Sequence, residues 1–76
     1  MEELLRYIVE ELIDSHDEIE IHKRTGHHSI TLDLRVPPEE AGKIIGRNGR
    51  VVKSIRDVLG IMAARENKRV HLEVNA

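Results

Sequence analysis

Residues 42–56 read GKIIGRNGRVVKSIR, and this stretch decides how the rest of the chain is interpreted. Two glycines, Gly46 and Gly49, separate two segments whose apolar residues have helical spacing. The stretch carries five basic side chains and no acidic one, although the whole chain has a net charge of −2. A glycine turn inside the most positive part of an acidic chain indicates a negatively charged ligand.

The residues on both sides of the glycines predict two helices. After the turn, a helix begins near Arg50 and extends toward Asn67, and its apolar face comprises Val51, Val52, Ile55, Val58, Leu59, Met62 and Ala63. Before the turn, the two prolines and two glutamates of residues 37–40 are typical of a helix start. A short helix is therefore expected to end at about Ile45.

Three further segments alternate polar and apolar side chains and predict strands. They are EIEIHKR at 18–24, SITLDLRV at 29–36 and RVHLEV at 69–74. Gly26 stands between the first two and permits a tight turn, so these two strands are expected to form an antiparallel hairpin.

The N-terminal segment predicts an amphipathic helix with an acidic outer face. Its apolar stripe comprises Leu4, Leu5, Ile8, Val9, Leu12 and Ile13. Residues 1–20 hold eight acidic residues against Arg6 alone, a net charge of −7. We interpret these acidic residues as a solvated helix face.

The order of the elements is therefore α-β-β-α-α-β. Because each strand has one apolar face and each helix one apolar stripe, we expect an α+β fold in two layers. A three-stranded sheet would carry all three helices on one face, as a single domain spanning residues 1–76.

Composition excludes several classes of function. The chain has no cysteine, which excludes disulfides, thiolate metal sites and cysteine nucleophiles, and suits a reducing compartment. Its apolar runs are short, and its acidic start lacks the basic region of a secretion signal. We therefore expect a cytoplasmic protein. A chain of 76 residues leaves little depth for an active site, and no nucleophile motif is present, so we do not expect an enzyme or a cofactor.

The chemistry of the turn favours a phosphate backbone as the ligand. A helix that begins at Arg50 exposes unpaired main-chain N–H groups, which attract anions. Glycines at 46 and 49 remove the Cβ atoms that would keep a phosphodiester away from the main chain. Arg47 and Asn48 add donors. Without this context, a lone G-x-x-G is better explained as a helix C-cap and turn.

IIGRNG followed by RVVKSI resembles the signature of KH domains, whose GXXG loop clamps about four nucleotides of a single strand. The element order is similar to that of the type II KH fold. The likeness covers nearly the whole chain and extends to the stand-alone bacterial KH proteins of the KhpA family. That resemblance implies a cytoplasmic RNA-binding protein with a role in post-transcriptional regulation. It also implies self-association, pairing with a larger KH-containing partner, or both.

Carried over residue by residue, the resemblance implies an RNA site around the loop. One of Ile44 and Ile45 is expected in the core and the other in the groove. Residues 29–36 would form the opposite groove wall, and residues 24–29 the variable loop. The expected RNA-binding residues are Lys43, Ile45, Gly46, Arg47, Asn48, Gly49, Arg50 and Lys53.

Because Tyr7 is the only aromatic residue of the chain, base stacking is unavailable, and a weak sequence preference is expected. We expect His22, His27 and His28 to be ordinary exposed histidines and not metal ligands, since neighbouring strand residues point apart. Ile61 lies off the apolar stripe of its helix and predicts a dimer interface. A protein-interaction subunit that binds little RNA remains the alternative function.

Overall fold

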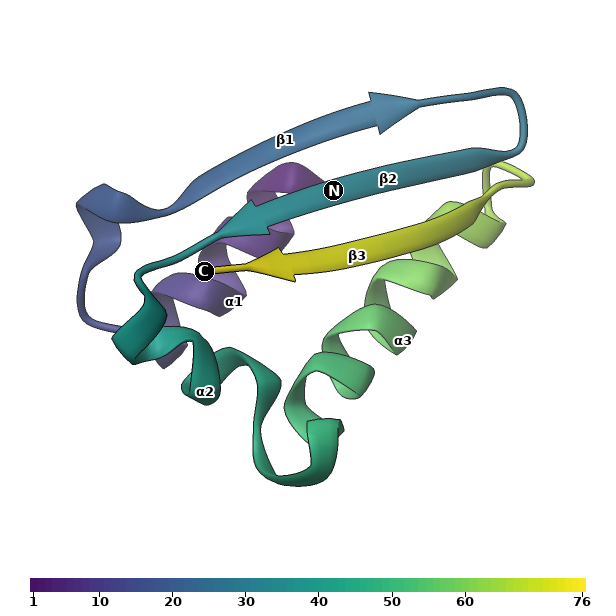
Figure 1. Ribbon diagram of the computed structural model, residues 1–76. Coiled ribbons are helices and arrows are strands. Elements are labelled where there is room, and N and C mark those ends of the chain that lie inside the picture. Colours follow the sequence, from purple (N-terminus) through teal and green to yellow (C-terminus); the bar gives the residue numbers. More distant parts are fainter.

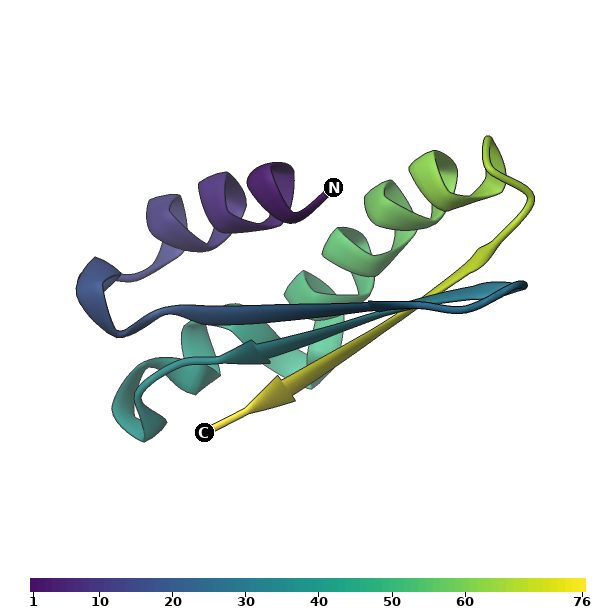
Figure 2. The same ribbon diagram turned by 90° about the horizontal axis from the view of Figure 1, so that it is seen from above.

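The computed structural model describes residues 1–76 and has two layers, a three-stranded sheet and three helices that cover one of its faces (Figure 1). Seen from above, α1 and α3 lie on the same side of the sheet (Figure 2). This confirms the predicted α+β fold and the order α-β-β-α-α-β. The elements are α1 (Glu2–Leu12), β1 (Glu20–Thr25), β2 (Ser29–Arg35), α2 (Ala41–Ile45), α3 (Arg50–Ala64) and β3 (Arg69–Asn75).

The sheet has the order β1-β2-β3, with β2 in the centre. β1 is antiparallel to β2, as the hairpin at Gly26 predicted, and its Ile21 stands opposite Leu34. β3 is parallel to β2 and pairs Val74 with the same Leu34. A parallel partner requires a long crossover, and here the crossover consists of α2, the glycine turn and α3. The predicted RNA site therefore lies within the connection between two paired strands.

The core lies between the sheet and the helices. Because side chains alternate along a strand, Ile30, Leu32 and Leu34 of β2 all point toward the helices, and all are buried. The largest fully buried side chains are Leu5, Val9, Ile30, Leu32, Leu34, Ile44 and Leu59. Burying each leucine or isoleucine contributes about 1.5–3 kcal/mol relative to leaving it exposed. No helix covers the opposite face of the sheet, which carries charged and polar side chains.

Two element boundaries differ from the prediction. β1 begins at Glu20 because His16–Glu18 form a turn of 3₁₀ helix. At the start of this turn, His16 Nε2 lies 2.9 Å from the carbonyl oxygen of Ile13. α3 ends at Ala64, and the turn that follows ends at Asn67, whose φ of 59° is left-handed. None of the helices is both long and apolar enough to span a bilayer.

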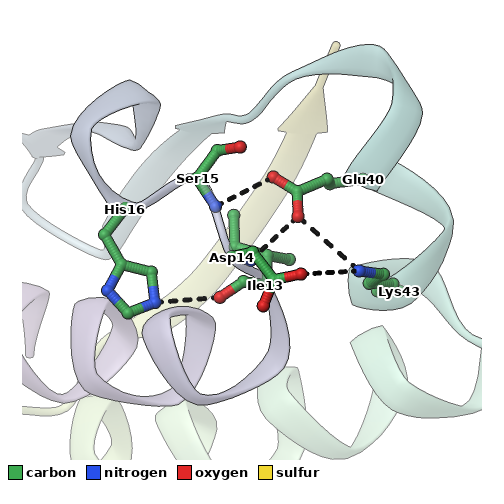
Figure 3. A network of polar contacts seen from close by, with 6 residues as sticks. All are labelled: Ile13, Asp14, Ser15, His16, Glu40 and Lys43. Atoms are coloured by element: carbon green, nitrogen blue, oxygen red, sulfur yellow. Dashed lines mark hydrogen bonds and ion pairs between the residues drawn. The ribbon is translucent and has the colours of Figure 1, made fainter.

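Glu40 ties the end of α1 to the start of α2 (Figure 3). It is the one buried charged residue, with 6% of its surface exposed. Its carboxylate accepts hydrogen bonds from the main-chain N–H groups of Asp14, at 2.8 Å, and Ser15, at 3.1 Å. Lys43 Nζ lies 3.6 Å from the same carboxylate and 3.6 Å from that of Asp14. A buried carboxylate with these partners is fully hydrogen-bonded, so it fixes α2 against the linker after α1.

Glu40 makes the stability of the fold depend on pH. Its hydrogen bonds, first to Asp14 and then to Ser15, hold the pKa of Glu40 below its usual value of 4.5. The stabilisation is complete above pH 4.5 and is lost as pH falls through the lowered pKa of the folded state. We therefore predict that Glu40→Gln lowers the free energy of unfolding at pH 7 and that its difference from the wild type narrows toward pH 3. Urea unfolding at several pH values measures both quantities.

Glu39→Gln is the matched control, because the neighbouring Glu39 is exposed and makes no hydrogen bond within the chain. It should leave the pH profile of the wild type unchanged. A difference between wild type and Glu40→Gln that stays constant from pH 7 to pH 3 would contradict the role of the Glu40 carboxylate.

Candidate nucleic-acid interface

The glycine turn joins α2 to α3 at a sharp corner, at the end of the two helices that points away from the sheet (Figure 1). α2 ends at Ile45 and is capped by Gly46, whose φ is 76° and ψ 175°, a conformation that is essentially restricted to glycine. Asn48 and Gly49 follow with φ of 56° and 71°, both left-handed. Three positive φ angles within four residues let the chain reverse and start α3 at Arg50.

The two glycines of the turn have different surroundings. A Cβ at Gly46 would collide with the side chain of Val51 and stand 2.9 Å from the main-chain nitrogen of Val51. A Cβ at Gly49 would meet nothing within 4 Å. The missing side chain of Gly46 therefore makes room for α3 itself, whereas that of Gly49 leaves main chain open to solvent. We expected both glycines to admit a ligand, and that expectation is wrong for the Cβ side of Gly46.

The two isoleucines before the turn point in opposite directions. Ile44 is fully buried, and Ile45 is 41% exposed. The sequence did not determine which of the two isoleucines lies in the core, and the structure shows that it is Ile44. Ile45 offers an apolar surface directly before Gly46, as its place among the expected RNA-binding residues requires.

The basic residues around the turn form two groups. Arg47 and Arg50 are exposed and make no ion pair, so their guanidinium groups are available to an anion. Lys53 forms an exposed pair with Asp57 at 3.3 Å, which contributes little stability. Lys43 is paired with two carboxylates, as described above, and its side chain is half exposed, so these ion pairs weaken its attraction for a further anion. The structure thus separates Lys43 from the other expected phosphate contacts.

The strand next to α3 is β3 and not β2. Because β2 is paired with a strand on both sides, it presents no free edge, and the expectation that residues 29–36 form the groove wall is wrong. β3 has a free edge beside α3, and Gly60 of the helix lies next to Val70. Arg56 shares a surface hollow with Val70 and Leu72 there. The sequence analysis counted Arg56 in the basic stretch but left it out of the site.

The histidines lie away from the turn. His22 is on β1, and His27 and His28 are in the hairpin turn; all three are exposed. The rings of His27 and His28 are 6.4 Å apart. No set of three histidine, aspartate or glutamate side chains is arranged to hold a metal ion.

α3 also presents an apolar patch to solvent, formed by Val58 and Ile61. Ile61 is 63% exposed, as its position on the helix predicted. Val58 was expected on the buried face of the helix and is 44% exposed, so that expectation is wrong. The patch is one turn of helix long and lies on the half of α3 farther from the glycine turn.

The different surroundings of the two glycines predict different costs of substitution. Gly46→Ala combines backbone strain of about 1–3 kcal/mol with overpacking against Val51 of about 1–3 kcal/mol. Gly49→Ala adds only left-handed strain, about 1–2 kcal/mol. We predict the larger loss of unfolding free energy for Gly46→Ala, measured by urea unfolding. Equal losses for the two variants would contradict the packing described here.

Comparison with known proteins places this geometry in a family. A family model described as "KhpA/KhpB, KH domain" matches residues 2–74. The chain is 46% identical over 74 residues to the RNA-binding protein KhpA of Clostridium acetobutylicum, covering 97% of this chain and 99% of that protein. It is also 46% identical over 72 residues to the RNA-binding protein KhpA of Borreliella burgdorferi, covering 95% and 88%. No solved structure matches it. The chain therefore belongs to the KhpA/KhpB family of KH domains.

Proposed function

We propose that this protein binds single-stranded RNA without catalysing a reaction and that residues 46–49 clamp the sugar–phosphate backbone. The observation that carries the proposal is the open main chain at Gly49, flanked by the unpaired guanidinium groups of Arg47 and Arg50. The relatives described above are named RNA-binding proteins, which supports the same ligand. A cytoplasmic location and a role in post-transcriptional regulation belong to the proposal, because the resemblance implies both.

Three contributions add up at the loop. The N-terminus of α3 carries a partial positive charge, although the main-chain N–H groups of Gly49 and Arg50 already donate to the carbonyl oxygens of Gly46 and Arg47. Gly49 lets a phosphate approach this main chain because no side chain stands in the way. Arg47 and Arg50 then supply charge-assisted hydrogen bonds, which are stronger than those between neutral groups. Each neutralised phosphate should lower the slope of log affinity against log salt by about 0.7 for a single strand.

The bases contribute less than the backbone in this proposal. Tyr7, the single aromatic residue, lies on α1 and not beside the loop, so bases cannot stack near the clamp. Ile45 and the free edge of β3 offer an aliphatic contact and main-chain groups instead. We therefore expect a weak sequence preference and a modest affinity, which a second linked site would raise.

The exposed patch of Val58 and Ile61 favours a second activity, association through α3. It provides an apolar contact for a second copy of this chain or for a larger KH-containing partner. A protein-interaction subunit with little RNA binding is the alternative that this patch supports. The two activities use opposite ends of α3, so separate substitutions can test them.

We predict that Arg47→Asp combined with Asn48→Asp lowers affinity for short single-stranded RNA at least tenfold, because the clamp then repels phosphate. Fluorescence anisotropy at two salt concentrations measures both the affinity and the salt slope. Arg65→Asp combined with Asn67→Asp is the matched control. It makes the same change in charge at the other end of α3, and aspartate tolerates the left-handed φ of Asn67.

The control should retain most of the affinity. An equal loss in both double variants would mean that only the total charge matters. RNA binding that is unaffected by the change in the loop would favour the protein-interaction alternative.

We predict that the protein self-associates and that Ile61→Asp converts it to a monomer, because a charge would be buried against the apolar patch of the second copy. Sedimentation equilibrium measures the mass in solution. Tyr7→Asp is the control, since Tyr7 is a comparably exposed apolar residue, 62%, on another helix. An Ile61→Asp variant with unchanged mass would remove α3 as the interface, and so would a monomeric wild type.

A further inference from the structure

The face of the sheet that no helix covers has a hollow beside β3, which we call the outer-face hollow. Arg24, Thr31 and His71 stand opposite one another in register on the three strands, so they share this face. Arg56 reaches the same hollow from α3 across the free edge of β3. The full lining is Arg24, Thr31, Arg56, Val70, His71, Leu72 and Glu73, around a volume of about 560 Å³.

The outer-face hollow differs in charge from the other three surface hollows. Arg24 and Arg56 outweigh Glu73 there, whereas acidic residues outnumber basic ones in each of the other three surface hollows. Arg24 Nη2 lies 3.3 Å from the carboxylate of Asp33, so part of its charge is offset, and its remaining N–H groups are available to a second acceptor. The neighbouring carboxyl group of Asp33 raises the pKa of Glu73, and the positive charges of Arg24 and His71 lower the same pKa in part. These four side chains therefore lie close enough to interact.

The position of Arg56 connects the hollow with the loop. Arg56 follows Gly49 by seven residues, which is about 10 Å along the axis of α3. It makes no ion pair, and β3 has no further strand beyond its edge. A nucleic-acid strand held at Gly49 would therefore meet Arg56 within a few nucleotides, and from there it would cross the outer face of β3 and β2 to reach Arg24 on β1.

The lining suits a phosphate group and not an enclosed small molecule. Sites for small molecules are usually deep and lined by apolar and aromatic side chains. This hollow is shallow, has no aromatic ring other than the imidazole of His71, and gathers two guanidinium groups from separate elements. Guanidinium groups match the geometry of phosphate oxygens and form paired hydrogen bonds with them.

We propose that the outer-face hollow binds a phosphate group of the same RNA strand, beyond the nucleotides held at residues 46–49. Arg24 and Arg56 contact that phosphate, and Thr31 and His71 border it. The protein therefore contacts a longer stretch of RNA than the loop of residues 46–49 could contact alone. The proposal rests on the RNA binding proposed above and adds a second contact site to it.

Oligouridines of four and eight nucleotides test this inference with the full chain. The informative variant combines Arg24→Gln with Asp33→Asn, which removes one ion pair and leaves the net charge unchanged. The matched control combines Arg6→Gln with Glu10→Gln, which removes an ion pair on α1 without changing the net charge, together with the hydrogen bond from Arg6 to the carbonyl oxygen of Ile19. We expect the first variant to lose about two- to fivefold in affinity for the eight-nucleotide RNA. Its affinity for the four-nucleotide RNA should stay unchanged, and the control should bind both like the wild type.

Amide chemical shifts provide a second measurement. Thr31, Val70 and His71 should shift when the eight-nucleotide RNA is added and stay in place with the four-nucleotide RNA, while Gly49 shifts with both. If the variant with Arg24→Gln and Asp33→Asn loses the same affinity for both RNA lengths, or binds both like the wild type, the proposal of a second contact site is wrong. A wild type that binds neither RNA overturns the proposed function itself, so the two failures are distinct.

Discussion

The contact between the main chain at Gly46 and the first turn of α3 is the constraint on which the site depends. No other residue fits there, because a Cβ would occupy the space of Val51 and the backbone conformation is one that side chains oppose. The contact fixes the corner at which α3 begins. It also determines which flank of α3 faces β3, and therefore where Arg50 and Arg56 project. One glycine thus serves the packing, and the other, Gly49, leaves the main chain accessible.

Charge in this small protein is divided between stabilising the fold and attracting a ligand. Lys43 lies close in sequence to the loop, yet its ammonium group belongs to the network of Glu40 and Asp14. Arg47 and Arg50 have no such partners. A count of basic residues along the sequence gives all of them equal weight, whereas only the unpaired ones keep their full attraction for phosphate. This division explains how a chain with a net charge of −2 can carry a locally positive surface.

The periodicity of apolar residues was sufficient to predict every helix and strand, because each element buries a single face. It did not predict the position of β3, since side-chain alternation says nothing about which strand is the neighbour. For the same reason, the groove wall was assigned to the wrong strand. Glu40 appeared to be one of two ordinary acidic residues in a first helical turn, and its burial depends on the main chain of residues 14 and 15, distant in sequence. Arg56 was missed because the site was defined by the loop motif and not by the free edge of β3.

The parallel pairing of β2 with β3 has a consequence for synthesis of the chain. Ser29 pairs with Arg69 and Arg35 with Asn75, so every contact of this ladder joins residues far apart in sequence. Contacts between distant residues slow folding, because the intervening loop must close before they contribute. On the ribosome, β2 emerges long before β3. Until β3 has also emerged, the apolar face of α3 lacks the strand against which it packs. The pairing of β2 with β3 is therefore complete only after the last residues of the ladder, up to Asn75, have emerged.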